Sequence, residues 1–81
     1  MVKVNLWSNL KASADGQSVV EVEAKTIKEM FAELERLYPR MKGYLDQGLA
    51  VSIDGQIYQD AWFKKISEED DIHILPRFTG G

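Results

Sequence analysis

Residues 26–39 have the sequence TIKEMFAELERLYP and carry the local signals of one amphipathic helix. Thr26 stands three residues before Glu29, which is the capping-box spacing that satisfies free N–H groups at the start of a helix. Pro39 ends or redirects the helix, because the residue before a proline is disfavoured in the α region. Apolar side chains recur between these limits at helical spacing, at Ile27, Met30, Phe31, Leu34, Leu37 and Tyr38. We therefore expect this stripe to pack as core.

Two strand patterns precede this helix. Residues 2–7 alternate between apolar and polar side chains, which is the period of a strand with one buried face. Residues 20–23 alternate in the same way, after a polar stretch at residues 8–18 that contains the turn dipeptide Asp15-Gly16. We therefore expect an N-terminal hairpin with a fairly long loop.

After the helix, the chain carries a second hairpin signal. Residues 41–45 allow one loose helical turn, and residues 49–53 then alternate as a strand. Asp54-Gly55 is a dipeptide that two-residue hairpin turns favour, and residues 56–58 follow it as a short returning strand. The sequence therefore predicts a tight hairpin in the second half of the chain.

The last strand follows a segment without periodicity. Residues 59–67 are irregular and include Trp62 and Phe63, which we expect to cover an edge of the core unless one of them is an exposed binding aromatic. Residues 68–71, EEDD, are predicted to be a charged turn. A metal site is the less favoured alternative, because no histidine or cysteine spacing accompanies the carboxylates. Residues 72–74 then alternate as the last strand.

The predicted order is strand, strand, helix, strand, strand, strand. A single amphipathic helix must bury its apolar stripe, and a mixed sheet with that helix on one face is the economical arrangement. The sequence therefore predicts an α+β fold of the β-grasp, or ubiquitin-like, class, with a mixed sheet of four to five strands and one main helix. We expect residues 1–75 to form this domain and residues 76–81 to form a flexible C-terminal tail.

The composition argues against several classes of function. The 81 residues carry a net charge of −3 at pH 7, whereas a nucleic-acid-binding domain usually has a basic surplus. No apolar run approaches the ~20 residues that span a bilayer, and no apolar h-region follows an N-terminal charge, so we expect no membrane span and no secretory signal. The chain has no cysteine, and therefore no disulfide, thiolate nucleophile or thiolate metal site. We expect a cytoplasmic protein.

The sequence closes with Gly80-Gly81, after residues 72–79, IHILPRFT. Glycine has no Cβ, so its backbone can approach another surface as closely as any residue allows. A terminal glycine carboxylate can therefore enter a narrow active site and be activated there, although a frayed terminus is the alternative interpretation. In a chain without cysteine, this carboxylate is also the one group that could hold sulfur.

The closing stretch, residues 69–81, resembles the end of the MoaD/ThiS family of ubiquitin-like sulfur carriers. Members close with an acidic turn, an apolar strand, one or two prolines, a hydrophobic residue, a small residue and Gly-Gly, and the matching stretch here is EDDIHILPRFTGG. Glu69 stands where the family usually has glycine, and Arg77 where a second proline is common, but neither affects the terminal glycines. The resemblance covers essentially the whole chain, because the helix length and the Asp54-Gly55 hairpin also suit the family.

This resemblance implies a reaction at the C-terminus. An ATP-dependent enzyme related to those that activate ubiquitin adenylates the Gly81 carboxylate, and a sulfur donor converts the acyl-adenylate to a thiocarboxylate. A larger sulfur-accepting enzyme then takes the sulfur. The chain length favours molybdopterin synthesis, in which the chain would correspond to the small subunit of molybdopterin synthase. The carrier is expected to bind no cofactor, metal, nucleic acid or membrane, and to use ATP only through the activating enzyme.

Five residues near this end are the candidate site. Gly81 is the expected acceptor of adenylate and sulfur, and Gly80 gives it clearance. Leu75, Arg77 and Phe78 are candidate partner contacts, and Leu75 should point away from the core if the last strand buries its isoleucines. A tail that folds back over Phe78 and a solvated Arg77 are the alternatives. About five residues beyond the last strand could extend ~15 Å at ~3.3 Å per residue.

Other functions stay open as alternatives. A ubiquitin-like modifier conjugated through Gly81 would use the same adenylate, and a carrier for thiamin or cysteine synthesis would differ in the destination of the sulfur. A passive interaction module would never be activated. A free-standing enzyme is the least favoured, because the sequence has no nucleophile–base pair, metal-ligand spacing or nucleotide motif. His73, the only histidine, is expected to be a solvated residue on the outward face of the last strand.

Overall fold

The computed structural model describes residues 1–76 of the chain. Its elements follow the predicted order, with short helical segments added between the strands. They are β1 (Val2–Leu6), α1 (Ser8–Lys11), the 3₁₀ helix η1 (Ala12–Ala14), β2 (Val19–Val22), α2 (Ile27–Leu37), the 3₁₀ helix η2 (Pro39–Met41), α3 (Lys42–Asp46), β3 (Ala50–Ile53), β4 (Gln56–Tyr58) and β5 (Ile72–Leu75).

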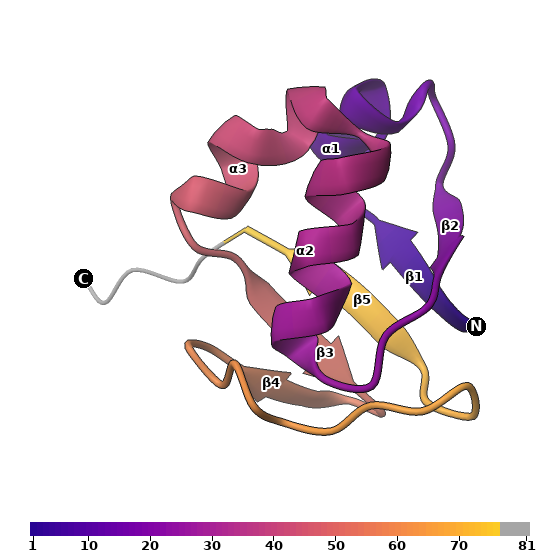
Figure 1. Ribbon diagram of the computed structural model, residues 1–81, viewed down its shortest axis with the longest axis vertical. Helices are drawn as coiled ribbons and strands as arrows, with labels where there is room; N and C mark the ends of the chain where they lie inside the picture. Colours follow the sequence, from indigo (N-terminus) through magenta and orange to yellow (C-terminus); the bar gives the residue numbers. More distant parts are fainter. Residues whose placement is uncertain (77–81) are drawn as a thin grey trace.

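The five strands form one mixed sheet in the order β2-β1-β5-β3-β4 (Figure 1). β1 and β5 pair in parallel, and every other pair of neighbours is antiparallel. The first and last strands therefore lie side by side at the middle of the sheet, although most of the chain separates them in sequence. The α+β, β-grasp prediction is confirmed, with five strands in the sheet and α2 as the main helix.

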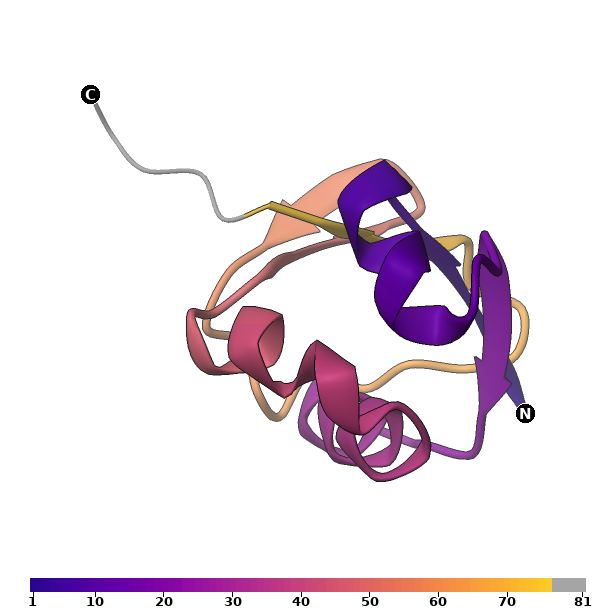
Figure 2. The same cartoon turned by 90° about the horizontal axis from the view of Figure 1, so that it is seen from above.

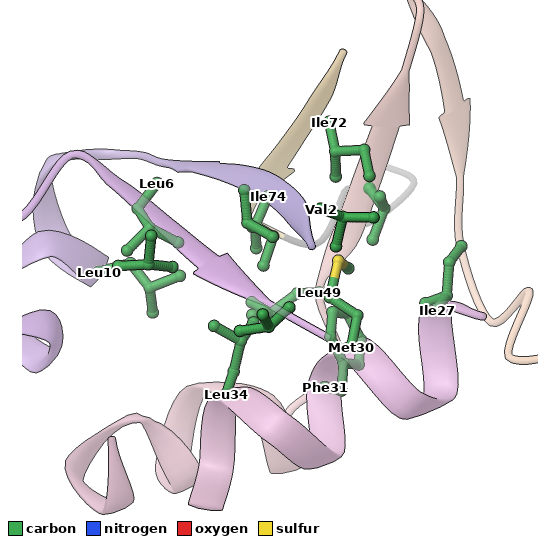
Figure 3. Close-up of a cluster of buried hydrophobic side chains, with 14 of the residues drawn as sticks. Val2, Leu6, Leu10, Ile27, Met30, Phe31, Leu34, Leu49, Ile72 and Ile74 are labelled. Carbon is green, nitrogen blue, oxygen red and sulfur yellow. The ribbon is translucent and has the colours of Figure 1, made fainter. Parts of the chain in front are cut away.

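One face of the sheet packs against α2, and this interface forms the core. Figure 2 shows the sheet on one side of the molecule and the helices on the other. Met30 and Leu34 of α2 are fully buried, and Ile72 and Ile74 of β5 belong to the same apolar cluster from the sheet side (Figure 3). Removal of this apolar surface from water, at about 25 cal/mol per Å², is the main force that holds the helix on the sheet.

The predicted capping residue is present at the amino end of α2. The Thr26 hydroxyl accepts a hydrogen bond from the Glu29 N–H at 3.2 Å. The Glu29 carboxylate accepts in return from the N–H of Lys25, at 3.1 Å, one residue before the cap. The two hydrogen bonds fix both the first turn of the helix and the chain that enters it.

Residues 59–67, predicted to be irregular, supply hydrogen-bond acceptors to the same end of the helix. The N–H of Ile27 donates to the carbonyl of Lys64 at 3.0 Å, and the N–H of Lys28 donates to the carbonyl of Trp62 at 2.8 Å. Together with the Thr26 hydroxyl, these carbonyls satisfy the first three N–H groups of α2, which have no partner inside the helix. The segment lacks regular structure because its backbone hydrogen bonds go to another element.

The apolar stripe of α2 is buried over most of its length. Ile27, Met30, Phe31 and Leu34 are buried and Tyr38 packs against the core, but Leu37 is 41% exposed. The prediction that the whole stripe is core is therefore wrong at Leu37. At 3.6 residues per turn this side chain lies roughly 80° around the helix from the first residue of the stripe, at the stripe's edge.

The stretch between β1 and β2, predicted as a loop, contains helical turns. Leu10 in α1 and Ala14 in η1 are fully buried, and the Leu10 N–H donates to the carbonyl of Trp7 at 3.0 Å. Their i, i+4 spacing is the signal that the loop prediction overlooked. The predicted turn follows, with Asp15 and Gly16 at φ values of 56° and 81°.

The second half of the chain folds as its turn signals predict. Asp54 and Gly55 both have positive φ, 51° and 87°, as a two-residue turn of the I′ type between β3 and β4 requires. A loose helical turn is predicted at residues 41–45, and the structure has η2 and α3 over residues 39–46. No helix in residues 1–76 has the length and apolar character needed to cross a membrane.

Candidate functional site

β5 lies at the middle of the sheet and carries the chain to the last described residues. Ile74 pairs with Leu6 of β1, and Leu75 pairs with Ala50 of β3, so both neighbours hold this strand up to its carboxyl end. Pro76 follows and is exposed, and it has no N–H with which to continue the ladder. The candidate tail therefore starts at the surface from a well-supported part of the fold.

The alternation predicted for β5 is present. Ile72 and Ile74 are fully buried, and Leu75 is half-buried, as expected for a side chain on the opposite face of the strand. The predicted outward placement of Leu75 is therefore confirmed, and its role as a partner contact stays a prediction. The other four predicted site residues lie outside the described residues: Arg77, Phe78, Gly80 and Gly81. The boundary between domain and flexible tail also stays a prediction.

An aromatic pair borders the place where β5 ends. Trp7 directly follows Leu6, the register partner of Ile74. Its ring meets that of Tyr44 in α3 edge-on, with the centroids 6.2 Å apart and the planes at 90°. Edge-to-face pairs of this kind stabilise a contact beyond the area that they bury. Sequence reasoning missed this pair, because α3 brings Tyr44 to Trp7 only in the folded chain.

Polar side chains occupy the outward face of the central strands. Asn5 of β1 and Ser52 of β3 are the register partners of His73, one on each side. The Nε2 atom of His73 lies 3.0 Å from a carboxylate oxygen of Asp71, and the Asn5 amide donates to the carbonyl of Ile72 at 2.8 Å.

In the described part of the chain, Asp71, His73 and Ser52 do not form a catalytic triad. His73 contacts Asp71, but no hydrogen bond joins His73 to Ser52, and that bond is what would activate a serine nucleophile. The His73 side chain is 45% exposed, as the sequence predicts for a solvated face. The arrangement can supply polar contacts to a docked surface, and it lacks the elements of nucleophilic catalysis.

Two backbone N–H groups of the segment before β5 donate to carboxylates, one within the acidic turn and one in the β3–β4 turn. The carboxylate of Asp70 accepts from the N–H of Ser67 at 2.9 Å, and that of Asp54 accepts from the N–H of Asp71 at 2.9 Å. Among residues 1–76, no group of three or more histidine, aspartate or glutamate side chains is arranged to hold a metal ion. These contacts therefore orient the chain into β5.

The fold and this site define a ubiquitin-like β-grasp domain that presents the carboxyl end of its central last strand. Two crystal structures share the fold. A chain of the Amycolatopsis orientalis BexX/CysO complex has a TM-score of 0.79 and 20% identity, and the match covers 100% of both chains. CysO of Mycobacterium tuberculosis, described as an antigen, has a TM-score of 0.80 and 18% identity over 96% of this chain and 100% of its own.

The chain belongs to the ThiS family, whose model matches residues 2–81. The resemblance read from the end of the sequence is thereby confirmed, and the chain is a sulfur carrier protein. No curated protein matches it in sequence.

Proposed function

We propose that the chain carries sulfur as a thiocarboxylate on Gly81. The observation that carries this proposal is the family match, which extends to residue 81 and so includes Gly80 and Gly81. The position of β5 supports it, because Pro76 stands at the surface beyond a strand that is paired on both sides. The residues from 77 to 81 could extend about 16 Å from there, which is enough to reach into a recessed active site.

The proposed chemistry explains why the carrier needs a second protein. A carboxylate is a poor electrophile, because its negative charge repels an incoming nucleophile. Attack of a Gly81 carboxylate oxygen on the α-phosphorus of ATP releases pyrophosphate and leaves an acyl-adenylate. Hydrosulfide, or an equivalent sulfur donor, then attacks the acyl carbon; AMP leaves, a proton is released, and a thiocarboxylate results. The activating enzyme would supply the nucleotide site and the metal that neutralises phosphate charge.

We further propose that the docking surface for this enzyme surrounds the start of the tail. Leu75 is half-buried at the end of β5, the aromatic pair of Trp7 and Tyr44 involves the residue that follows the neighbouring strand β1, and Arg77 and Phe78 would extend this surface. One similar structure comes from a complex of two proteins, BexX and CysO, which supports a partner for this chain as well. The sulfur-accepting enzyme would use the same tail in turn.

Two destinations for the sulfur are candidates. The chain length favours molybdopterin synthesis, whereas the likeness to CysO structures favours the alternative of cysteine synthesis. Identities of 18 and 20% establish the fold alone, so the pathway is decided by which sulfur-accepting enzyme discharges the carrier. A cytoplasmic location stays a prediction.

Intact mass spectrometry tests the proposal. The full chain is incubated with the activating enzyme, ATP and sulfide, and we expect the mass increment of one oxygen replaced by sulfur. The variant Gly81→Val should lose this increment, because its Cβ and branched side chain obstruct a site shaped for glycine. The matched control Thr79→Ser should keep it. Hydroxylamine added in place of sulfide should trap the acyl-adenylate as a hydroxamate.

The same experiment separates the alternatives. A protein modifier would appear as higher-mass covalent adducts that form through Gly81 and resist thiol-reactive reagents. A passive module would keep its original mass under all conditions. An unchanged mass in the presence of an activating enzyme that converts another ThiS-family carrier contradicts the proposal.

A further inference from the structure

An exposed aromatic pair lies in the segment between β4 and β5. Trp62 packs edge-on against Phe31 of α2, with ring centroids 5.6 Å apart, and still leaves 38% of its surface exposed. Its neighbour Phe63 is 78% exposed. Trp62 therefore covers an edge of the core as predicted, and Phe63 fits the alternative that one of the two aromatics is exposed, because its apolar surface faces solvent.

Two lysines lie over aromatic rings in this part of the molecule, one over Phe63 and one over Tyr58. The Lys28 Nζ atom lies 5.6 Å from the centroid of Phe63, and the Lys64 Nζ atom lies 5.3 Å from that of Tyr58. Within residues 1–76, neither lysine forms an ion pair, whereas Lys42 bridges two acidic side chains. The surface made by Lys28, Tyr58, Trp62, Phe63 and Lys64 thus combines open positive charge with open apolar area. We call it the aromatic–lysine patch.

The backbone beneath this patch is held in place. The carbonyls of Trp62 and Lys64 accept hydrogen bonds from the first turn of α2, and the N–H of Ile66 donates to the carbonyl of Lys25 at 2.9 Å. The Ile66 side chain is buried, at 7% exposure, and ties the segment to the core. Because the aromatic side chains are displayed on an ordered backbone, a partner would lose little conformational entropy of this protein on binding.

The aromatic–lysine patch is separate from the candidate tail site. Trp62 contacts α2, which covers one face of the sheet (Figure 2). Leu75 is half-buried and alternates with the buried isoleucines of β5, so it belongs to the opposite face. In Figure 1 the segment between β4 and β5 passes below the amino end of α2, away from the carboxyl end of β5. The patch residues therefore belong to α2, β4 and the segment after β4, and none of them belongs to β5.

We propose that the aromatic–lysine patch is a docking surface for an acidic segment of a partner protein, one that places carboxylates against Lys28 and Lys64 and an apolar side chain against Phe63. Carboxylates complement the positive charge of the two lysines, and an apolar side chain can pack against the exposed Phe63 ring. A long nucleic acid fits less well, because the two lysines of the patch can neutralise few of its phosphates. The proposal goes beyond sulfur transfer, since it does not involve Gly81.

Titration of the ¹⁵N-labelled full chain with the peptide acetyl-EDLEEL-amide tests this proposal. We expect saturable shifts of the backbone signals of Lys28, Phe63 and Lys64 and of the Trp62 indole signal. The Trp7 indole, which packs against Tyr44 of α3 and is not part of the patch, should not shift and serves as an internal control. The neutral peptide acetyl-QNLQQL-amide should bind about tenfold or more weakly.

Paired variants give the decisive comparison. Lys28→Glu with Lys64→Glu should weaken peptide binding at least about tenfold, and Phe63→Ala about fivefold. The controls change the same charge and a comparable apolar side chain elsewhere: Lys3→Glu with Lys11→Glu, and Ile57→Ala, whose side chain is 45% exposed on β4. These controls should bind as the parent protein does.

Several outcomes overturn the proposal. They are equal binding by the test and control variants, shifts centred on the outward face of the sheet, no saturable binding, or tighter binding of a twelve-nucleotide single-stranded DNA than of the acidic peptide. A loss of folding would be recognised, because the backbone spectrum reports the fold and every substituted side chain is exposed except the half-buried Lys11. Since no activating enzyme is present, this test can fail while the thiocarboxylate on Gly81 still forms, and the reverse also holds.

Discussion

The helix α2 and the segment of residues 59–67 lie against each other, and they are specified in opposite ways. The helix is specified by signals in its own sequence, namely a capping threonine, an apolar stripe and a proline that follows its end. The segment has no periodicity, and its backbone groups bond to the first turn of the helix. Local sequence therefore decides the first structure, and the presence of a neighbouring element decides the second.

This difference predicts that the two regions respond differently to mutation. Loss of a buried helix residue should weaken the whole domain, because α2 covers the single core. Loss of an anchor in the segment should release that segment and uncap the helix, with less effect on the sheet. The predictions below test this contrast, beginning with the largest expected effect.

Leu34→Ala should be the most destabilising change. The side chain is fully buried between α2 and the sheet, and a buried Leu→Ala substitution typically lowers the free energy of unfolding by about 3–5 kcal/mol. Leu37→Ala, three residues later but 41% exposed, should cost about 1 kcal/mol or less. Urea unfolding followed by circular dichroism measures both values. Similar losses in the two variants would contradict the burial that separates Leu34 from Leu37.

Ile66→Ala should have an intermediate effect, about 2–3 kcal/mol, because a buried anchor is lost at the edge of the core. The sharper readout is local. Hydrogen exchange of the Ile27 and Lys28 amides, which donate to the segment, should accelerate more than that of the β1 and β5 amides. Uniform acceleration across the domain would show that the segment and the sheet unfold as one unit.

Thr26→Ala should cost about 1 kcal/mol, since the hydroxyl that accepts from Glu29 is removed. Thr26→Ser keeps the acceptor and should retain most of the stability. Both variants are compared by their urea midpoints. If the serine variant were as unstable as the alanine variant, packing of the threonine methyl group would account for the loss instead of the cap.

The smallest expected effect concerns an exposed ion pair on α2. Arg36 donates two hydrogen bonds to the Glu33 carboxylate, at 2.7 and 3.1 Å, and this hydrogen bonding lowers the pKa of Glu33. A lowered pKa in the folded state contributes stability above the ordinary pKa of glutamate, and that contribution is lost as pH falls through the folded value. Glu33→Gln should therefore be slightly less stable than the parent at about pH 7 and equal to it at about pH 2.5. Urea midpoints at the two pH values measure this. A difference that persists or grows in acid would assign the effect to helix propensity or packing.

The sequence predicts the fold more completely than the site. Strand alternation, the Asp54-Gly55 turn and the α2 pattern are local signals, and the structure confirms each of them. The prediction errors occur where a local signal is short, or where a residue with the right spacing lies at the edge of the buried face. Leu10 and Ala14 form an i, i+4 pair too brief to predict a helix, and Leu37 has the right spacing but lies at the edge of the stripe.

The candidate site likewise contains some features that the sequence predicts and others that it does not. The outward placement of Leu75 follows from alternation, which is a property of any strand, and the family match confirms the resemblance that the closing residues indicate. The Trp7–Tyr44 pair and the aromatic–lysine patch could not be foreseen. Each joins residues that are distant in sequence, and no periodicity relates them.

By itself, then, the sequence determined the type and order of the main elements, the turn between β3 and β4 and the class of carrier, because these depend on hydrophobic period, backbone preference and motif. Only the tertiary structure decided which strands are neighbours, which apolar side chains stay exposed and where residues 59–67 find their hydrogen-bond partners. Such features depend on contacts between distant parts of the chain, whose geometry is set when the sheet and α2 bury their common core.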